Sequence, residues 1–429
     1  MSRRVVITGM GVVAPNGVGL EAYEQALRDG ASGIRHIPLL DELKFGCRVA
    51  GVPQGVDELA EEMFGEDELL AMNSSHRYGC IAAVEAWTDA GFERPEHDDE
   101  TVKWEVGAII GTGIGGLDTT GEKLVPMVDA GRVRRLGSTI VEQVMGSGVS
   151  ARVSGLLALG NQVTSNSSAC STGGEAVVEG YYRIREGRAE RMLCGGTEGA
   201  SQYAWGGFDS MRVLCRKFND EPEKASRPLS ASAGGFVPGS GAGILHLESL
   251  ESAEARGARI YAEILGGALN CGGHRGGGSM TAPNPAGVQR CIRQAIDAAG
   301  VEGHEIDAIN GHLTATGADP REVHSWATAL GLTPDTFPLI NSTKSMIGHG
   351  LGAAGALESV ACILMLQGGF VHASINCEDV HPEIEPFAAS IPHETRDTPD
   401  LQTIIKAGFG FGDVNVCVIF RRWPDQAPA

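Results

Sequence analysis

The chain has 429 residues, of which 42% are hydrophobic and 21% are charged. This length is enough for two core-sized units or for one large duplicated unit. The formal net charge of −20 argues against a general nucleic-acid or membrane-surface binder, because phosphate groups would be repelled. We therefore expect a globular protein with no nucleic acid and no membrane among its partners.

The first predicted element is a buried strand at Val5–Val13, which follows two arginines. A charged start before an apolar run can also be a signal peptide, but Gly11 and Pro15 break this run and no cleavage site follows. No apolar run approaches the roughly 18–20 residues that span a bilayer. The ten cysteines stand singly, without a CxxC pair or a Cys/His ligand cluster, as in a protein with reduced thiols. We expect a cytoplasmic protein with no metal and no cofactor.

Short apolar strands alternate with amphipathic helices along the first half. After the first strand, the pattern predicts helices at Leu20–Asp29, Ser75–Ala90 and Glu175–Glu186, and strands at Val106–Ile110 and Arg191–Cys194. This alternation indicates an α/β architecture.

The second half repeats the same rhythm. Its predicted strands are Ala258–Leu265, Ile306–Asn310, Thr403–Ala407 and Asn415–Phe420, and its predicted helices are Ala286–Ala299, Asp319–Leu330 and Leu351–Leu366. No low-complexity linker separates the halves, and residues 250–258 are the best candidate for their junction. We divide the chain into an N-terminal half at 1–255 and a C-terminal half at 256–429.

Two stretches of the chain look alike. Ala169–Gly187 and Gly348–Gly368 each begin with small residues and continue as a helix that ends in Gly. The likeness indicates an internal duplication. A duplicated core would bury the N-termini of both helices at the centre of the molecule.

Cys170 lies among small residues at the start of a predicted helix. Small neighbours let a substrate approach the sulfur, and a helix N-terminus favours the thiolate and so lowers the pKa of the thiol. An unreactive Cys that fills a tight corner beside Ala169 fits the same residues. The local pattern does not decide between these two interpretations.

Three other segments carry polar or glycine-rich patterns. His312 follows the apolar strand Ile306–Asn310 directly; α/β folds place chemistry at such strand ends, although a loop His held by its neighbours is the simpler interpretation. Lys344 and His349 lie in a Gly/Ser-rich run that lacks the residue order of a nucleotide P-loop, so a cationic cluster that polarises a carbonyl is the better hypothesis. Alternating Gly and Phe in Ala407–Asp413 suit a loop that offers backbone N–H groups, or equally a tight aromatic turn.

Four motifs, taken in chain order, resemble those of the elongating 3-oxoacyl-(acyl-carrier-protein) synthases. These are the type I and type II beta-ketoacyl synthases of the thiolase-like superfamily. They are Ser-Ser-Ala-Cys-Ser-Thr-Gly around Cys170, Gly-His-Leu-Thr-Ala-Thr around His312, Thr-Lys-Ser-Met-Ile-Gly-His at residues 343–349, and Gly-Phe-Gly-Phe-Gly at residues 408–412. The likeness runs nearly end to end. It implies two stacked βαβαβαββ halves in a five-layer α/β/α/β/α sandwich, usually as a homodimer.

The resemblance also implies a role for each motif. Cys170 would take the acyl chain from acyl carrier protein as a thioester, and the backbone N–H groups of Cys170 and Phe411 would hold the oxyanion. His312 and His349 would donate hydrogen bonds to the malonyl thioester oxygen and so stabilise the enolate left when carbon dioxide departs. Lys344 would set the electrostatics of the two histidines through Glu322.

The remaining implied residues concern the acyl chain and the carrier. The acyl pocket would be lined by Ile114, Phe208 and Phe409, with Phe411 as its gatekeeper. Arg212 matches a docking arginine for the acidic carrier, whereas the clusters Arg216-Lys217 and Arg132–Arg135 are equally typical of a solvated face. The stretch Glu61–Glu68 is acidic where relatives often show lysines, which argues against carrier contact there.

The resemblance therefore predicts a decarboxylating Claisen condensation of a Cys-bound acyl chain with malonyl-acyl-carrier-protein, in fatty-acid elongation. A second His, where initiating relatives carry Asn, favours a carrier-bound primer. Several departures, such as Gly412-Asp413-Val414-Asn415 in place of Gly-Gly-Thr-Asn, keep open a ketosynthase of a polyketide or aryl-polyene pathway. A partner subunit of the chain-length-factor type is a further alternative, against which the presence of Cys170 argues. A thiolase is disfavoured because Phe409–Asp413 contains no second Cys.

Overall fold

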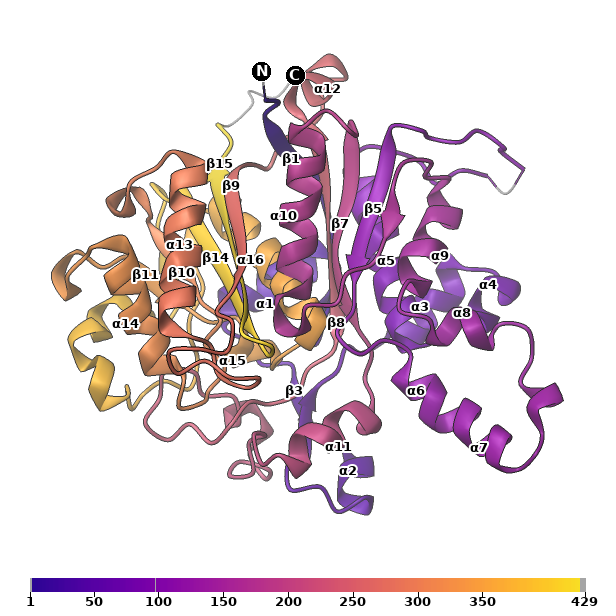
Figure 1. The fold of residues 1–429 in the computed structure, drawn as a ribbon, viewed down its shortest axis with the longest axis horizontal. Coiled ribbons are helices and arrows are strands. Elements are labelled where there is room, and N and C mark those ends of the chain that lie inside the picture. Colours follow the sequence, from indigo (N-terminus) through magenta and orange to yellow (C-terminus); the bar gives the residue numbers. More distant parts are fainter. Residues whose placement is uncertain (1, 97, 425–429) are drawn as a thin grey trace.

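The computed structural model describes residues 2–96 and 98–424. Its centre is an 11-stranded sheet made of two five-stranded halves and one short extra strand (Figure 1). The strands of the first half are β1 (Val5–Ala14), β5 (Val106–Gly111), β6 (Val163–Thr164), β7 (Arg191–Glu198) and β8 (Gly241–Ser249). Those of the second half are β9 (Ala262–Cys271), β10 (Ala308–Asn310), β11 (Leu339–Asn341), β14 (Thr403–Gly410) and β15 (Val414–Arg422). The extra strand is β2 (Gly17–Val18), which pairs with β1.

The two halves share one connectivity. In space the first half runs β1-β8-β7-β5-β6, and the second half runs β9-β15-β14-β10-β11. In the first half, β8 runs antiparallel to both of its neighbours, and β5 runs parallel to both of its neighbours. In the second half, β15 corresponds to β8 and β10 corresponds to β5, with the same directions. Strands β1 and β9 pair antiparallel and join the halves, with Val5 opposite Ile264. This matching order confirms the predicted internal duplication.

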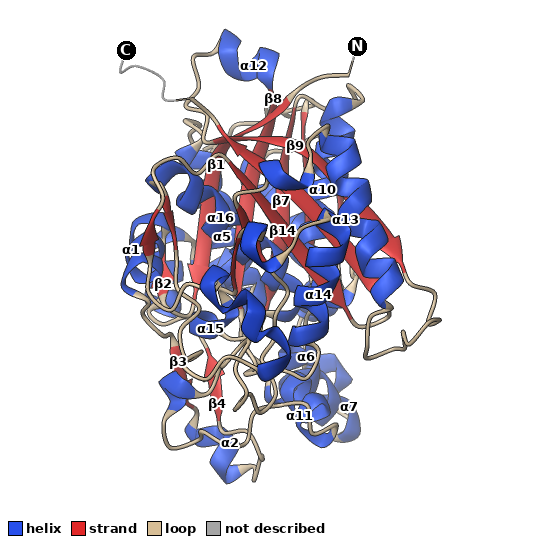
Figure 2. Ribbon diagram, turned by 90° about the vertical axis from the view of Figure 1, so that its left-hand side faces the viewer, coloured by secondary structure: helices blue, strands red, loops and turns tan. Residues whose placement is uncertain are grey.

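Six helices complete the layers. They are α5 (Ser74–Asp89), α9 (Gly148–Leu157), α10 (Thr172–Arg185), α13 (Pro285–Ala299), α14 (Asp319–Leu330) and α16 (Ala354–Gly368). Helices α10 and α16 contact each other and strands of both halves, whereas α5 and α9 pack on the first half and α13 on the second, with α14 beside it (Figure 2). The predicted five-layer, thiolase-like α/β/α/β/α fold is confirmed.

Helix α16 is the most apolar element of the core. The segment Leu351–Gly368 is long and apolar enough to cross a membrane by length and composition, but 89% of it is buried inside the protein. A helix that is apolar on all sides belongs in a core or in a membrane, and the packing of α16 against six strands of the sheet places it in the core. Glu358 is its buried carboxylate.

The starts of the two central helices touch through glycines. A Cβ added at Gly173 would lie 2.7 Å from the Ala356 nitrogen, and one added at Gly355 would lie 2.5 Å from the Gly174 nitrogen. Larger residues at these positions would push the helices apart. The small residues seen in both sequence stretches therefore allow the N-termini of α10 and α16 to meet, as predicted.

The structure corrects one predicted strand and adds one that was not predicted. The strand predicted at Ala258–Leu265 begins later, at Ala262, and extends to Cys271. Strand β8 begins at Gly241, within a glycine-rich stretch that gave no strand signal. Gly243 is needed there because an added Cβ would lie 2.6 Å from the Ala356 carbonyl carbon of α16.

Shorter elements surround this core. An arm between β5 and β6 holds α6 (Leu117–Thr119), a π-helical turn at Thr120–Leu124, α7 (Val125–Asp129), a 3-10 turn at Val133–Arg135 and α8 (Ile140–Val144). The others are α1 (Leu20–Asp29), α2 (Pro38–Glu42), α3 (Val56–Met63), α4 (Glu66–Leu70), α11 (Gln202–Ser210), α12 (Leu250–Ala255), α15 (Lys344–Ile347), β3 (Ile34–His36), β4 (Val49–Gly51), β12 (Phe370–Val371) and β13 (Arg396–Asp397). The arm projects away from the sheet at the lower right of Figure 1.

Candidate active site

Cys170 lies in the 3-10 turn Ala169–Ser171 that leads into α10. Ala169 has φ 49, a left-handed conformation that is costly for a residue with a side chain. The Thr172 hydroxyl braces this turn, since it accepts from the Ser168 N–H at 2.8 Å and donates to the Ala169 carbonyl at 2.6 Å. The chain thus stores strain directly before the sulfur, as is common at functional sites.

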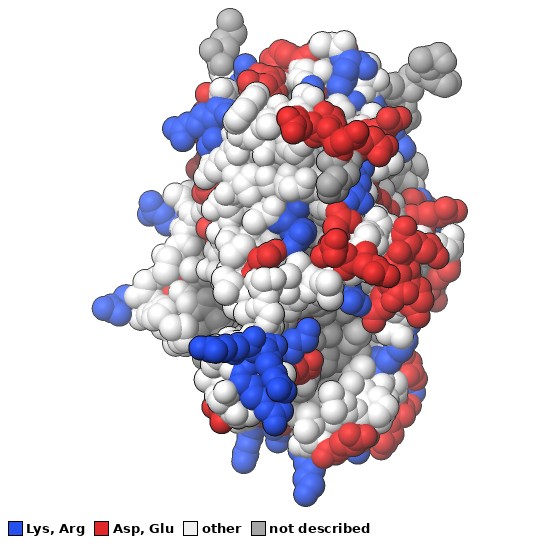
Figure 3. Space-filling view, turned by 90° about the vertical axis from the view of Figure 1, so that its right-hand side faces the viewer, with Lys and Arg blue, Asp and Glu red and all other residues white. Residues whose placement is uncertain are grey.

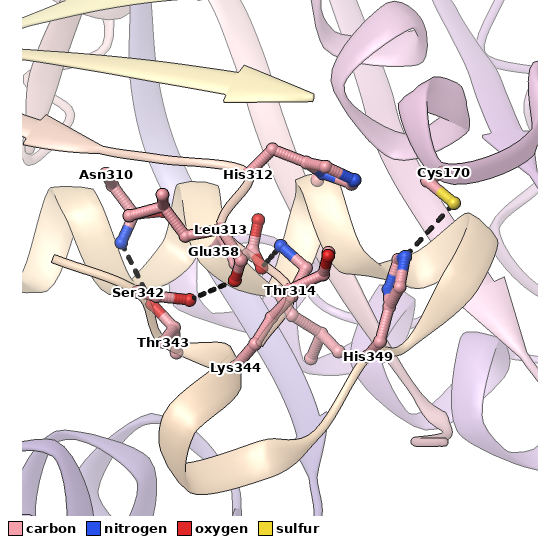
Figure 4. A network of polar contacts seen from close by, with 12 residues as sticks. Cys170, Asn310, His312, Leu313, Thr314, Ser342, Thr343, Lys344, His349 and Glu358 are labelled. Atoms are coloured by element: carbon pink, nitrogen blue, oxygen red, sulfur yellow. Dashed lines mark hydrogen bonds and ion pairs between the residues drawn. The ribbon is translucent and has the colours of Figure 1, made fainter. Parts of the chain in front are cut away.

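Two imidazoles from the second half converge on this sulfur (Figure 4). His349 Nε2 lies 3.0 Å from Cys170 Sγ, and the rings of His312 and His349 are 5.4 Å apart, edge to face. The sulfur and one nitrogen of each ring all lie within 4.8 Å of one another. The structure thus brings together the three side chains that the sequence motifs predict to converge.

The tautomer of His349 follows from its second ring nitrogen. The Leu351 N–H donates to His349 Nδ1 at 3.2 Å, so in the neutral ring the proton lies on Nε2. Burial lowers the pKa of both His349 and His312 well below the usual value, and the charge of Lys344 lowers each further. Both rings are therefore neutral at physiological pH, and His349 presents an N–H to the sulfur.

The thiol itself is less acidic than the sequence predicted. Burial raises the pKa of the Cys170 thiol to about 11, although a hydrogen bond from the Phe411 N–H and the charge of Lys344 both lower it. Desolvation of the thiolate thus outweighs the helix N-terminus, and the prediction of a lowered pKa is wrong. The free site holds a neutral thiol beside a neutral imidazole.

The loop that carries His312 is held by two buried carboxylates. Glu322 accepts from the N–H groups of His312 at 2.6 Å and Leu313 at 2.9 Å. Asp319 accepts from those of Thr314 and Ala315, at 2.9 and 3.0 Å. Burial raises the pKa of Glu322 to about 7, while the hydrogen bond from Leu313 opposes that shift.

The carboxylate that pairs with Lys344 is Glu358 rather than Glu322. Lys344 Nζ contacts one carboxylate oxygen of Glu358, and Lys406 Nζ lies 2.7 Å from the other. All three side chains are at most 2% exposed. Glu322 makes no ion pair with Lys344, because both of its oxygens bind the backbone of the His312 loop, but its charge still raises the pKa of Lys344.

The sequence reading missed Glu358 and Lys406, although each left a signal. Glu358 is a carboxylate in the otherwise apolar helix α16, and Lys406 interrupts the apolar run Thr403–Ala407 of β14. A charged residue inside a fully buried element needs a partner of opposite charge. Pairing the two charges would have predicted the cluster.

A cavity of about 210 Å³ opens onto the three converging side chains. Phe208, Phe409 and Phe411 line it, as predicted, together with the hydroxyl-bearing Thr314 and Thr316. Ile114 is not among the lining residues in the described part of the chain; its side chain is 37% exposed, and its N–H is bound by Glu198 at 3.1 Å. The prediction that Ile114 lines the pocket is not supported.

Arg212 lies at the end of α11, exposed and with φ 59. The next residue, Val213, lines the cavity. The geometry thus places the predicted docking arginine beside the cavity.

The thiol and the two imidazoles are also close enough together to ligate a metal ion. Three such donors with one open position match the ligand number of a catalytic zinc site. The distances between these three donors are compatible with a metal ion, so the absence of a metal stays a prediction.

A buried thiol, two neutral imidazoles and a backbone N–H on a duplicated thiolase-like fold are the groups expected of a condensing enzyme. Comparison with known proteins agrees. Residues 2–253 match the family "Beta-ketoacyl synthase, N-terminal domain", and residues 261–378 match "Beta-ketoacyl synthase, C-terminal domain". The chain belongs to the beta-ketoacyl synthase family of acyltransferases, which carry out a condensation.

Relatives cover the whole length of the chain. The 3-oxoacyl-[acyl-carrier-protein] synthase 2 of Vibrio cholerae is 35% identical over 98% of this chain and 99% of its own. A beta-ketoacyl synthase structure from Burkholderia phymatum has a TM-score of 0.89 at 31% identity, over 98% of this chain and 100% of that one. A type II PKS ketosynthase, solved in complex with its acyl-carrier protein, has a TM-score of 0.87 at 28% identity, over 99% and 100%.

Proposed function

We propose that this protein elongates an acyl chain in fatty-acid synthesis by condensing it with malonyl-acyl-carrier-protein. Cys170 Sγ attacks the thioester carbonyl of the acyl-carrier, its proton passes to the departing carrier thiol, and the acyl chain becomes a Cys thioester. The N–H of Phe411, which faces the sulfur, stabilises the oxyanion of this step together with the Cys170 N–H.

The second half-reaction uses the imidazoles. The malonyl thioester oxygen accepts hydrogen bonds from His312 and from the Nε2–H of His349, carbon dioxide leaves, and the electron pair becomes an enolate. The enolate carbon attacks the acyl-Cys carbonyl, which releases the sulfur as a thiolate and leaves a 3-oxoacyl chain on the carrier. The thiolate then takes a proton from water and becomes the neutral thiol again. Donors aimed at an oxygen that gains charge in the transition state lower the barrier more than they strengthen binding.

The convergence of Cys170, His312 and His349 carries this proposal. The Leu351 N–H fixes Nε2 of His349 as a donor, and the buried Lys344 helps to hold both rings neutral. A neutral imidazole still donates a hydrogen bond through its N–H group. It keeps that proton and does not transfer it to the thioester oxygen. The site is thus arranged for hydrogen-bond donation to an enolate.

We further propose that the carrier is acidic and docks beside Arg212. The arm contributes three more exposed arginines, Arg132, Arg134 and Arg135. Figure 3 shows basic side chains gathered on the face that carries the arm, with acidic groups beside them. In an enzyme with a net charge of −20, such local positive charge steers an acidic partner.

The protein is also proposed to act as a homodimer in the cytoplasm. The ten cysteines are free thiols, which suits a reducing compartment. Four valines of the arm are each at least 46% exposed: Val125, Val128, Val133 and Val141. A second copy could cover them, and sedimentation of the purified protein would test this.

A panel of primers tests the activity and the pathway together. Purified protein is mixed with acyl-carriers of graded length and saturation, and intact mass spectrometry measures the adduct on Cys170. Malonyl-carrier is then added, and the 3-oxoacyl product is quantified. Cys170→Ala is the control that should load nothing. No adduct with any primer would refute the proposal, and an adduct only on a co-purified homologue would favour the partner-subunit alternative.

A ketosynthase of a specialised pathway remains the second candidate. The chain resembles both a fatty-acid-type synthase and a polyketide ketosynthase over its full length, and its turn reads Gly412-Asp413-Val414 where Gly-Gly-Thr is usual. Preference for polyene or 3-oxoacyl primers over saturated ones in the same panel would select this candidate.

A further inference from the structure

Asp413 occupies the turn between β14 and β15, two residues after Phe411. Its side chain is fully buried, and its φ of 61 places it in the left-handed region. A non-glycine residue tolerates such a backbone only when the surroundings hold it there. What holds Asp413 is a segment far away in the chain.

That segment is 272–284, between β9 and α13. Asp413 Oδ2 accepts from the His274 N–H at 3.0 Å, and Oδ1 accepts from the Asn284 N–H at 2.8 Å. The backbone adds two more links, from the Gly272 N–H to the Asp413 carbonyl at 2.9 Å and from the Gly412 N–H to the Met280 carbonyl at 2.8 Å. One carboxylate therefore ties both ends of the segment to the turn.

The fit between segment and carboxylate is close. A Cβ added at Gly272 would lie 2.3 Å from the Asp413 carboxylate, and one added at Gly278 would lie 2.5 Å from it. The segment contains five glycines, at positions 272, 273, 276, 277 and 278. Glycine-rich chain has many alternative conformations, so it needs fixed contacts to keep one shape.

Both parts that Asp413 joins belong to the active site. Thr281 and Pro283 of the segment line the cavity, as does Phe411 of the turn. The Phe411 N–H donates to the Cys170 sulfur. A shift of the turn would therefore move an oxyanion donor and a cavity wall at once.

We propose that Asp413 is a positioning residue that locks the segment 272–284 and the Phe411 turn into one unit over Cys170. It acts through the Phe411 N–H and does not touch the reacting atoms. The proposal rests on the proposed acyl transfer to Cys170 for its catalytic consequence. We call the four hydrogen bonds that join Asp413 and Gly412 to the segment the clasp, and these contacts are observed whatever the protein's function is.

Two substitutions distinguish the effect of the Asp413 carboxylate from the effect of its left-handed backbone. Asp413→Gly suits the left-handed φ and removes both acceptors, whereas Asp413→Asn keeps one carbonyl acceptor at nearly the same size. Lys44→Gly is the matched control, because Lys44 is an exposed residue with φ 59 outside the cavity lining.

The first readout is limited trypsin digestion after Arg275, which lies exposed in the segment. Cleavage there should be about tenfold faster in Asp413→Gly than in the wild type, intermediate in Asp413→Asn and unchanged in Lys44→Gly, since local opening governs such cleavage. Equal cleavage in Asp413→Gly and the wild type would overturn the clasp. This test needs no enzymatic activity.

The second readout is the rate at which Cys170 takes an acyl group from an acyl-carrier. Loss of one oxyanion donor costs about 10²–10³-fold in rate, and a donor that is only loosened should cost about tenfold. We expect that loss in Asp413→Gly, with partial recovery in Asp413→Asn and an unchanged rate in Lys44→Gly. Faster cleavage with an unchanged loading rate would refute the positioning role. If the wild type loads no acyl group, the proposed function fails while the cleavage result still decides the clasp.

Discussion

Replacing Glu358 by Gln should destabilise the protein far more than a surface ion pair would. Glu358 bridges Lys344 and Lys406, and the three side chains are at most 2% exposed, so solvent screens them little. At 2.7 Å from Lys406 and an effective dielectric of about 20, each attraction is worth about 6 kcal/mol, offset by a desolvation cost of several kcal/mol per ion. Removing the shared carboxylate leaves two buried lysines without a carboxylate partner, for which a loss of about 3–5 kcal/mol is expected at neutral pH.

The pH dependence of that loss gives a second check. Burial already lowers the pKa of Lys344, and Glu358 opposes that shift, so the variant should lower this pKa further. A lysine that is neutral when folded but protonated when unfolded binds more protons in the unfolded state, and stability then rises with pH. The destabilisation should therefore shrink as the pH rises from 7 towards the unfolded value of 10.5.

Urea unfolding followed by tryptophan fluorescence at pH 7 and at pH 9.5 measures both effects. Glu378→Gln is the control, because its pair with Arg227 involves a carboxylate that is 71% exposed and should contribute less than about 1 kcal/mol. Adding Lys406→Met to Glu358→Gln removes one surplus charge at similar volume and should recover part of the loss. A Glu358→Gln protein within about 1 kcal/mol of the wild type would refute the reasoning about buried charge.

Three further outcomes follow from the site. His312→Ala or His349→Ala should slow carbon dioxide release from malonyl-carrier by about 10²–10³-fold while Cys170 still loads an acyl group; wild-type release in either variant would show that its imidazole is not an enolate donor. Alkylation of Cys170 by iodoacetamide, followed on its own peptide, should rise about tenfold per pH unit from pH 8 upward, because burial raises the pKa of this thiol to about 11; a plateau below pH 9 would contradict that. Arg212→Glu should raise the KM for acyl-carrier several-fold at low salt and little at high salt, unlike the exposed control Arg293→Glu, and an equal effect of both would point to net charge rather than docking.

Motifs predicted well which side chains converge at this site, but not the groups that support them. Cys170, His312, His349 and Lys344 lie in short ordered runs, so their shared neighbourhood follows from recognising those runs. The carboxylate that faces Lys344 depends on how α16 packs against β14, which no local pattern encodes. Glu322, which lies in the first turn of α14, therefore looked like the natural partner although its oxygens bind backbone.

The same distinction explains one other error and one prediction that stays untested. The helix N-terminus at Cys170 is visible in the sequence and favours the thiolate, whereas the burial that raises the thiol pKa arises from the contact between the two halves. Ile114 follows a glycine turn typical of the pocket wall; Glu198, at the end of β7, binds its N–H and that of Gly113, and the role of its side chain stays a prediction. Strand and helix assignments were more reliable, because periodicity and glycine stops are local signals.

The duplication raises the question of why the second half does not repeat the site of the first. The turn before α16 repeats the turn before α10, since both are 3-10 turns whose first residue is left-handed, Ala169 with φ 49 and Leu351 with φ 48. The position after it is Cys170 in the first half and Gly352 in the second. Any Cβ at Gly352 would lie 2.3 Å from the Gly113 nitrogen, and its N–H is already bound by Glu198 at 2.8 Å. The second half thus has no room for a nucleophile, and its turn instead places His349 against the sulfur of the first.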